Sequence, residues 1–206
     1  MLITLDYLVK RYNLQINGVI HVGAHYGQEY GDYVKQGIKH MVFFEPLALA
    51  YAKLIETLGN NKNAVAFKLA LGNKVGQVAM YVETANKGMS SSVLKPELHL
   101  KYSPTITFDK REMVEIDKLD NIRLNRSLYN MINIDVQGYE LQVFKGATET
   151  LKNIDIIYAE VNFEELYHGC VHVEQLDSYL RKFGFVRVFT DTAHKSWGDA
   201  LYLKYE

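Results

Sequence analysis

Several acidic side chains follow apolar segments at positions where parallel strands would end. Residues 19–29 pass from β-branched residues through Gly23 and Gly27 into a helix-forming sequence, which predicts a strand, a tight turn and a helix N-terminus. A second apolar run, residues 41–44, ends in Glu45, and an acid at the tip of the next strand is where a ribose diol is usually held. The pattern therefore predicts a site for a ligand of the nucleotide type.

The turn itself disfavours a pyrophosphate. The dinucleotide fingerprint G-x-G-x-x-G lets the backbone approach the phosphates, but here Ala24-His25 stands at the second glycine and carries side chains. S-adenosylmethionine has adenine and ribose with an amino-acid carboxylate and ammonium in place of phosphates, so it suits this looser turn better. Taken alone, this stretch is also consistent with a strand–helix junction that serves only to pack the fold and binds no ligand.

Two more acids occupy equivalent positions further along the chain. Asp135 ends one apolar run, and Glu160 lies near the end of the next. In open α/β sheets the ligand crevice lies outside the carboxyl ends of the strands. We therefore expect these two acids to converge with Gly23 and Glu45 on one place.

A carboxylate or a histidine beside a hydroxyl acceptor can remove its proton. Asp135 is the first candidate for this base, although it could instead orient a cofactor or cap the next helix. Glu160 and His168 are the next candidates, and His168 is also consistent with an ordinary exposed histidine. Asp135, Glu160 and Asn162 together could ligate Mg²⁺, but no spacing demands a metal and none is predicted.

Other residues could bind an acceptor or close over it. Asn162 follows the strand that carries Glu160, and His194 with Trp197 could stack on the face of a sugar, whereas a tryptophan that packs is the more frequent case. The polar segment 87–93 could close over a ligand or be a solvated hairpin loop.

The elements that position these residues alternate between strands and helices. Alternation of this kind predicts an α/β fold with a doubly wound, mostly parallel sheet and right-handed crossovers. Residues 77–119 interrupt it, because their alternating pattern predicts an antiparallel β-hairpin inserted after the third strand. We expect helices over 5–14, 28–36, 47–58, 139–151 and 173–183, and strands over 19–22, 41–44, 64–71, 129–136, 154–161, 185–189 and 200–205.

Composition bounds the remaining possibilities. With 206 residues and 48% hydrophobic content, the chain is expected to form a single domain over 1–206, with an N-terminal helix within 1–15. A formal charge of −1 without a basic block argues against nucleic acid or a membrane surface as partner. The single cysteine, Cys170, and the lack of a leader-like or membrane-length apolar run favour a cytoplasmic location. The sequence does not indicate an oligomeric state.

Taken together, these segments resemble the FkbM-type family of class I S-adenosylmethionine-dependent methyltransferases. The resemblance extends over residues 18–161 in the family's order and spacing. The segments that carry it are His21-Val22-Gly23-Ala24-His25 with Gln28-Glu29, Phe44-Glu45-Pro46, Ala70-Leu71-Gly72-Asn73 with Gly76, Ser90-Ser91-Ser92, Ile116-Asp117-Lys118-Leu119-Asp120, and Ile134-Asp135-Val136-Gln137-Gly138-Tyr139-Glu140-Leu141 through Phe144-Lys145-Gly146-Ala147.

The resemblance implies a seven-stranded sheet in the order 3-2-1-4-5-7-6, with the last-numbered strand antiparallel. It also implies methyl transfer from S-adenosylmethionine to an oxygen of a sugar, glycan or small metabolite. The cofactor site that it implies consists of His21, Gly23, Ala24, Gly27, Glu45, Pro46, Ala70, Leu71, Ser91 and Asp135.

The chain departs from the family pattern at two positions. Gln137 stands where many members have an acid, which removes a charge beside Asp135, and His21 replaces a common acid. A neutral His21 could still bond the methionine ammonium. The alternative functions are an NAD(P)-dependent oxidoreductase, which the missing glycine disfavours, and a non-catalytic module that keeps the cofactor pocket.

Overall fold

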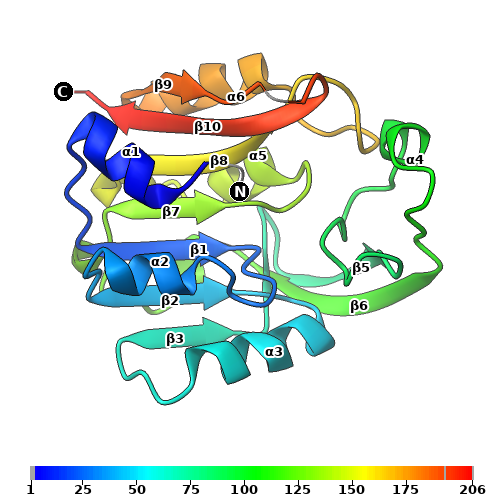
Figure 1. Cartoon of the computed structure of the whole chain (residues 1–206), viewed down its shortest axis with the longest axis horizontal. Helices are drawn as coiled ribbons and strands as arrows, with labels where there is room; N and C mark the ends of the chain where they lie inside the picture. The colour runs from blue at the N-terminus through cyan, green and yellow to red at the C-terminus, as the bar shows by residue number, and fades with distance from the viewer. Residues whose placement is uncertain (1–2, 193, 206) are drawn as a thin grey trace.

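A seven-stranded sheet forms the centre of the computed structural model, which describes residues 3–192 and 194–205 (Figure 1). Its order is β3-β2-β1-β7-β8-β10-β9. The strands are β1 (Gly18–Val22), β2 (His40–Phe44), β3 (Ala64–Phe67), β7 (Met131–Ile134), β8 (Ile156–Asn162), β9 (Phe185–Thr190) and β10 (Trp197–Lys204).

The sheet is mixed rather than wholly parallel. Neighbouring strands from β3 to β8 are parallel, and β10 is antiparallel to both β8 and β9. The observed order differs in its numbers from the expected 3-2-1-4-5-7-6, because β4, β5 and β6 belong to a second sheet and the expected numbering did not count them.

Helices cover both faces of the central sheet, so its inner strands are apolar on both sides. On one face α1 (Leu5–Tyr12), α2 (Tyr30–Lys35) and α3 (Ala48–Leu58) pack on Val19, Met41 and Met131. On the other face α5 (Glu140–Lys145) and α6 (Val173–Leu180) pack on Ile20, Val42 and Ile132. No helix of the described ranges combines the length and the apolar character that crossing a membrane requires.

Several helices are shorter than the sequence predicted. The helix α2 begins at Tyr30 instead of Gln28, because residues 24–29 form a turn in which the N–H of Gly27 donates to the Ala24 carbonyl. The helix α1 ends at Tyr12, because Asn13 adopts a left-handed conformation, and α6 gives way to a 3₁₀ turn over Arg181–Phe183. The helix expected to run through Leu151 ends at Lys145, and a separate 3₁₀ turn covers Thr150–Asn153.

The inserted segment forms a second sheet of three strands, β4 (Ala70–Leu71), β6 (Lys110–Asp117) and β5 (Gly76–Val82). The strands β5 and β6 pair antiparallel, as expected of a hairpin. The strand expected over 64–71 is wrong, because β3 ends at Phe67 and β4 pairs with β6 instead of with the central sheet. A short helix, α4 (Leu98–Tyr102), lies between β5 and β6 and was not expected.

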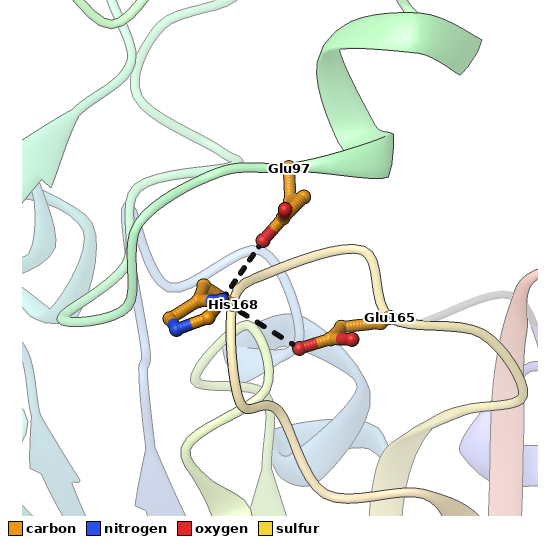
Figure 2. A group of neighbouring side chains, drawn as sticks. All are labelled: Glu97, Glu165 and His168. Atoms are coloured by element: carbon orange, nitrogen blue, oxygen red, sulfur yellow. Dashed lines mark hydrogen bonds and ion pairs between the residues drawn. The ribbon is translucent and has the colours of Figure 1, made fainter.

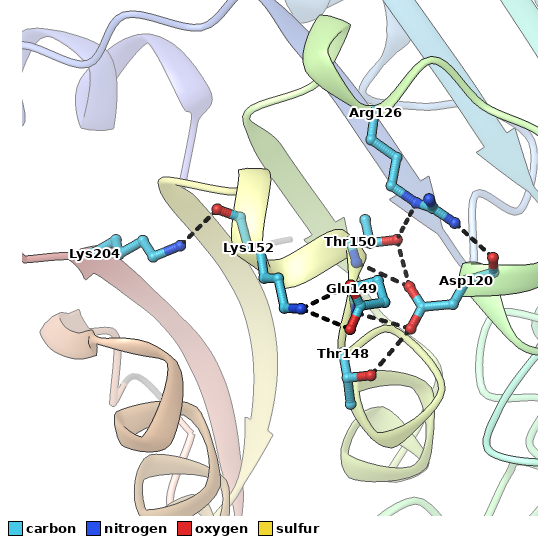
Figure 3. A network of polar contacts seen from close by, with 7 residues as sticks. All are labelled: Asp120, Arg126, Thr148, Glu149, Thr150, Lys152 and Lys204. Carbon is cyan, nitrogen blue, oxygen red and sulfur yellow. Dashed lines mark hydrogen bonds and ion pairs between the residues drawn. The ribbon is translucent and has the colours of Figure 1, made fainter.

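A polar network fixes the chain where it returns from the second sheet (Figure 3). The carboxylate of Asp120 accepts hydrogen bonds from the backbone N–H groups of Glu149 and Thr150, both at 2.9 Å, and from the Thr150 hydroxyl at 2.8 Å. Arg126 donates to the Asp120 carbonyl. The segment that resembled a family motif at Asp120 therefore joins the exit of β6 to the turn before β8.

Candidate functional site

A cavity of about 310 Å³ opens at the carboxyl ends of β1, β2 and β7, with residues from the loop 88–93 in its wall. The residues that were expected to hold a cofactor line it, with one exception: His21, Gly23, Ala24, Glu45, Pro46, Ala70, Leu71, Ser91 and Asp135. The exception is Gly27, which packs against α3, since a Cβ there would lie 2.9 Å from Leu54 Cδ1.

Gly23 brings β1 and β7 unusually close at the floor of this cavity. Its φ is +81°, and a Cβ at this position would lie 1.8 Å from the backbone oxygen of Asp135. Its N–H donates to the Phe44 carbonyl at 2.9 Å. The glycine is therefore required by the neighbouring backbone as well as by the shape of the cavity.

Glu45 lies in the cavity wall with its carboxylate held by two backbone groups. The N–H of His25 donates to Oε2 at 2.9 Å, and the N–H of Leu47 donates to Oε1 at 2.8 Å. Burial raises the pKa of Glu45 to about 7, and the two N–H groups oppose that rise. Each carboxylate oxygen can accept a further hydrogen bond beyond these.

His25 fills the position of the missing second glycine and holds the loop over the cavity. Its ring stacks on Tyr26 with the centroids 3.8 Å apart, and its Nε2 lies 2.9 Å from the carbonyl oxygen of Lys87. The side-chain nitrogen of Gln28 lies 2.9 Å from Nδ1. Because a carbonyl only accepts and an amide nitrogen only donates, these partners assign the proton of His25 to Nε2.

The loop itself is folded around a buried acid and is not a solvated hairpin turn. Glu83 is buried, and its carboxylate accepts from the N–H groups of Asn86 and Gly88. The Glu83 N–H donates to the hydroxyl of Ser91 at 3.0 Å. These bonds place Ser91 in the cavity wall.

His21 is buried and neutral. Burial lowers the pKa of its imidazole to about 4. Its Nδ1 lies 3.1 Å from the Tyr33 hydroxyl, which itself accepts from the amide of Asn133. Tyr33 therefore donates to Nδ1 and the His21 proton stays on Nε2, which lies 4.0 Å from a carboxylate oxygen of Glu29. In this tautomer Nε2 would donate a hydrogen bond, and the expected contact of His21 with the methionine ammonium stays a prediction.

Asp135 is linked to Glu160 through the side chain of Gln137. The amide nitrogen of Gln137 donates to Asp135 Oδ1 at 2.7 Å, and it lies 3.0 and 3.1 Å from the two carboxylate oxygens of Glu160. Burial raises the pKa of both carboxyls, and the charge of Asp135 raises that of Glu160 further. Glu160 is buried, contacts Gln137 and is not among the residues that line the cavity, and its role as a base stays a prediction.

His168, the other candidate base, is exposed and is not among the residues that line the cavity, and Figure 2 shows it between Glu97 and Glu165. Its exposed ring pairs with Glu97 at 3.0 Å and with Glu165 at 3.8 Å. Among the described residues these three form the group whose spacing could hold a metal ion.

The three residues expected to bind the acceptor lie together but outside the cavity wall. Asn162 stands opposite Trp197 in the pairing of β8 with β10, and His194 stacks on Trp197 with the ring centroids 4.5 Å apart. Asn162 is buried, and Trp197 packs with the cluster around Tyr167. This packing does not test whether the three residues also contact an acceptor, and that role stays a prediction.

His25 and Gln137 line the cavity, although the sequence analysis assigned neither of them a role in the site, and Tyr167 contacts Gln137. The Tyr167 hydroxyl lies 2.8 Å from both the Ser90 carbonyl and Gln137 Oε1. Gln137 follows β7 and Tyr167 follows β8, and these strands are parallel neighbours in the sheet, so no spacing in the sequence signals the contact between the two residues. The departure from the family pattern at Gln137 was the available clue.

Comparison with known proteins finds one matching family and a related enzyme, and both are methyltransferases. The methyltransferase FkbM domain matches residues 21–187. The 2-O-methyltransferase NoeI of Sinorhizobium fredii (strain NBRC 101917 / NGR234) is 27% identical over 179 residues, which cover 83% of this chain and 74% of that protein.

Solved structures share the fold at low identity. Streptococcus pneumoniae Sp1610 in complex with S-adenosyl-L-methionine has a TM-score of 0.55 and 14% identity, covering 99% of this chain and 75% of that one. Magnesium protoporphyrin IX methyltransferase from Synechocystis PCC 6803 with bound SAM has a TM-score of 0.54 and 10% identity, covering 97% and 76%. Both support the α/β architecture.

Proposed function

The chain belongs to the FkbM methyltransferase domain family, and we propose that it transfers the methyl group of S-adenosylmethionine to a hydroxyl oxygen of a sugar, glycan or small metabolite. The observation that carries the proposal is the charge of the cavity. Its wall contains the carboxylates of Glu29, Glu45 and Asp135, and no lysine or arginine among the described residues that line it. An acidic wall suits a sulfonium and an ammonium and disfavours the pyrophosphate of NAD(P), which counts against an oxidoreductase.

Different polar groups of the cavity are suited to two different parts of S-adenosylmethionine, its ribose and its amino-acid group. Glu45 is suited to accept both hydroxyls of a ribose, because its two oxygens are already oriented by the N–H groups of His25 and Leu47. Glu29 stands beside His21 at the other side of the turn and is suited to the methionine ammonium. His21, as an Nε2–H donor, is suited to the methionine carboxylate.

Bound S-adenosylmethionine supplies an electrophilic methyl group on a sulfonium. Asp135 has two tasks in our proposal: it orients the acceptor hydroxyl in line with the methyl group, and it accepts the hydroxyl proton as the oxygen–carbon bond forms and the carbon–sulfur bond breaks. Orientation can contribute about 7–11 kcal/mol to lowering the barrier, and general-base assistance about 10²–10⁴-fold in rate. A neighbouring sulfonium keeps Asp135 ionised, against the effect of burial on its pKa.

The acceptor class rests on the relatives. NoeI is named a 2-O-methyltransferase, which supports an oxygen acceptor for this chain. Asn162, His194 and Trp197 lie side by side at the end of β8, beyond Glu160, and are proposed to contact the part of a larger acceptor that extends outside the cavity.

Two measurements test the proposal. Calorimetry should show binding of S-adenosylhomocysteine and none of NADH, and transfer of labelled methyl to a panel of oligosaccharides and small hydroxyl compounds should identify an acceptor. Tighter binding of NADH would favour an oxidoreductase. Binding of S-adenosylhomocysteine without transfer to any acceptor in the panel would favour a module that retains the pocket without catalysis.

A further inference from the structure

Gln137 is held in a backbone conformation that a glutamine rarely adopts. Its φ is +55°, in the left-handed region, which costs on the order of 1 kcal/mol or more for a residue with a Cβ. The hydroxyl of Ser92 donates to its carbonyl at 2.8 Å. Such a conformation persists only where the surroundings over-determine it, so the position of this side chain is fixed by the structure around it.

The side chain of Gln137 has partners at both ends of its amide. The nitrogen donates toward Asp135 and Glu160, and the oxygen lies 2.8 Å from the hydroxyl of the fully buried Tyr167. The opposite amide orientation would place the amide oxygen between two carboxylates, neither of which has a hydrogen to donate when ionised. The partners therefore specify one orientation.

We propose that Gln137 is a positioning residue for methyl transfer: its amide, fixed by Tyr167, ties the Asp135 carboxylate to Glu160 and so aims it at the acceptor. The inference rests on the proposed function. A carboxylate is planar, so fixing Oδ1 also fixes the direction of the second oxygen, which would receive the acceptor's proton. The amide bears no charge, so it joins two neighbouring acids without adding to their repulsion.

An acid at this position would act differently. A glutamate would bring a third carboxylate into contact with Asp135 and Glu160, and it would have no donor for either unless it took up a proton. A glutamine satisfies both acids without a proton or a cation. The departure from the family pattern at Gln137 therefore has a local chemical role.

The test compares Gln137→Met with a matched control, Gln77→Met, which removes an exposed amide on β5. We expect Gln137→Met to lower kcat between about tenfold and a hundredfold, because a misplaced catalytic group costs rate, while the Kd of S-adenosylhomocysteine stays within about threefold. The control should leave both unchanged. Tyr167→Phe removes one hydroxyl and should give a smaller loss of the same kind if Gln137→Met does not fold.

A double-variant cycle separates positioning from a merely structural role. If Gln137 acts through Asp135, adding Gln137→Met to Asp135→Asn should lower kcat no further than Asp135→Asn alone. Losses that multiply would overturn the inference, as would an unchanged kcat in Gln137→Met. If Asp135→Asn itself retains full turnover, the proposed base is wrong, and that failure is distinct from the failure of Gln137.

Discussion

Binding of the cofactor's ribose should strengthen as the pH rises through 7. Burial raises the pKa of Glu45 to about 7, so near neutral pH a substantial fraction of the free protein carries this carboxyl protonated. In the proposed complex, two ribose hydroxyls would donate to the ionised form of Glu45 and lower its pKa, so binding would release a proton. The affinity is therefore expected to increase with pH and to level off once Glu45 is ionised without ligand.

The size of the effect follows from that pKa. The ionised fraction of Glu45 rises from about 10% at pH 6 to about 90% at pH 8, so affinity should rise about tenfold, or about 1.4 kcal/mol. The pH dependence of the contribution of Glu45 to folding stability has the opposite sign. A carboxyl whose pKa is raised in the native state holds its proton longer there, so its contribution to stability is greatest below its unfolded pKa of 4.5 and decreases as the pH rises through 7.

The assay is calorimetry with 5′-methylthioadenosine, which carries the ribose diol but no titratable amino-acid group. Wild type should bind about tenfold more tightly at pH 8 than at pH 6, and Glu45→Gln should bind weakly with little pH dependence. Glu56→Gln, an exposed change on α3, should behave as wild type. The reasoning would be refuted if the affinity of the wild type did not change with pH, or if Glu45→Gln kept the full pH dependence. Asp135 or Glu140 would then be the group to examine, since burial also raises the pKa of Glu140 to about 7.

Four further outcomes are expected. Asp135→Asn should reduce turnover at least about a hundredfold with little change in the Kd of S-adenosylhomocysteine; a loss confined to affinity would make Asp135 a cofactor ligand. Gly23→Val should lower both the Tm and cofactor affinity, because its Cβ would overlap the Asp135 backbone, and a variant with unchanged Tm would contradict that contact. Asp120→Ala should destabilise the fold by about 1–3 kcal/mol in urea unfolding without altering kcat, since it leaves the backbone N–H groups of Glu149 and Thr150 unsatisfied and none of these residues lines the cavity. His168→Ala should change kcat less than about twofold in the methyl-transfer assay, and a large loss would make the surface histidine a candidate base again.

The strands that carry the site could be predicted from local sequence. Each inner strand of a covered parallel sheet is a short apolar run on both faces, so β1, β2, β7 and β8 are visible as continuous runs. An acid directly after such a run must lie at the carboxyl edge of the sheet. For that reason the positions of Glu45 and Asp135 in the chain were enough to predict that both belong to one site, and both line the cavity.

Other features depend on contacts between distant segments. The split between β3 and β4 arises because Ala70 and Leu71 find pairing partners in β6, which no local pattern reveals. The apolar run over 64–71 looks the same whether it continues in one sheet or passes to another. Local preference specifies extended backbone, and only the partner strand decides which sheet it joins.

The chemistry of the site also depends on tertiary contacts. His168 and Glu160 have suitable side chains for a base, yet one lies exposed beside Glu97 and the other is buried and contacts Gln137. Their positions, and the raised pKa of Asp135, are set by burial and by neighbours that arrive from other elements. The sequence by itself determined which residues stand at the edge of the sheet; the tertiary structure decided which of them face the cavity, because desolvation and hydrogen bonding depend on what packs around a side chain in space.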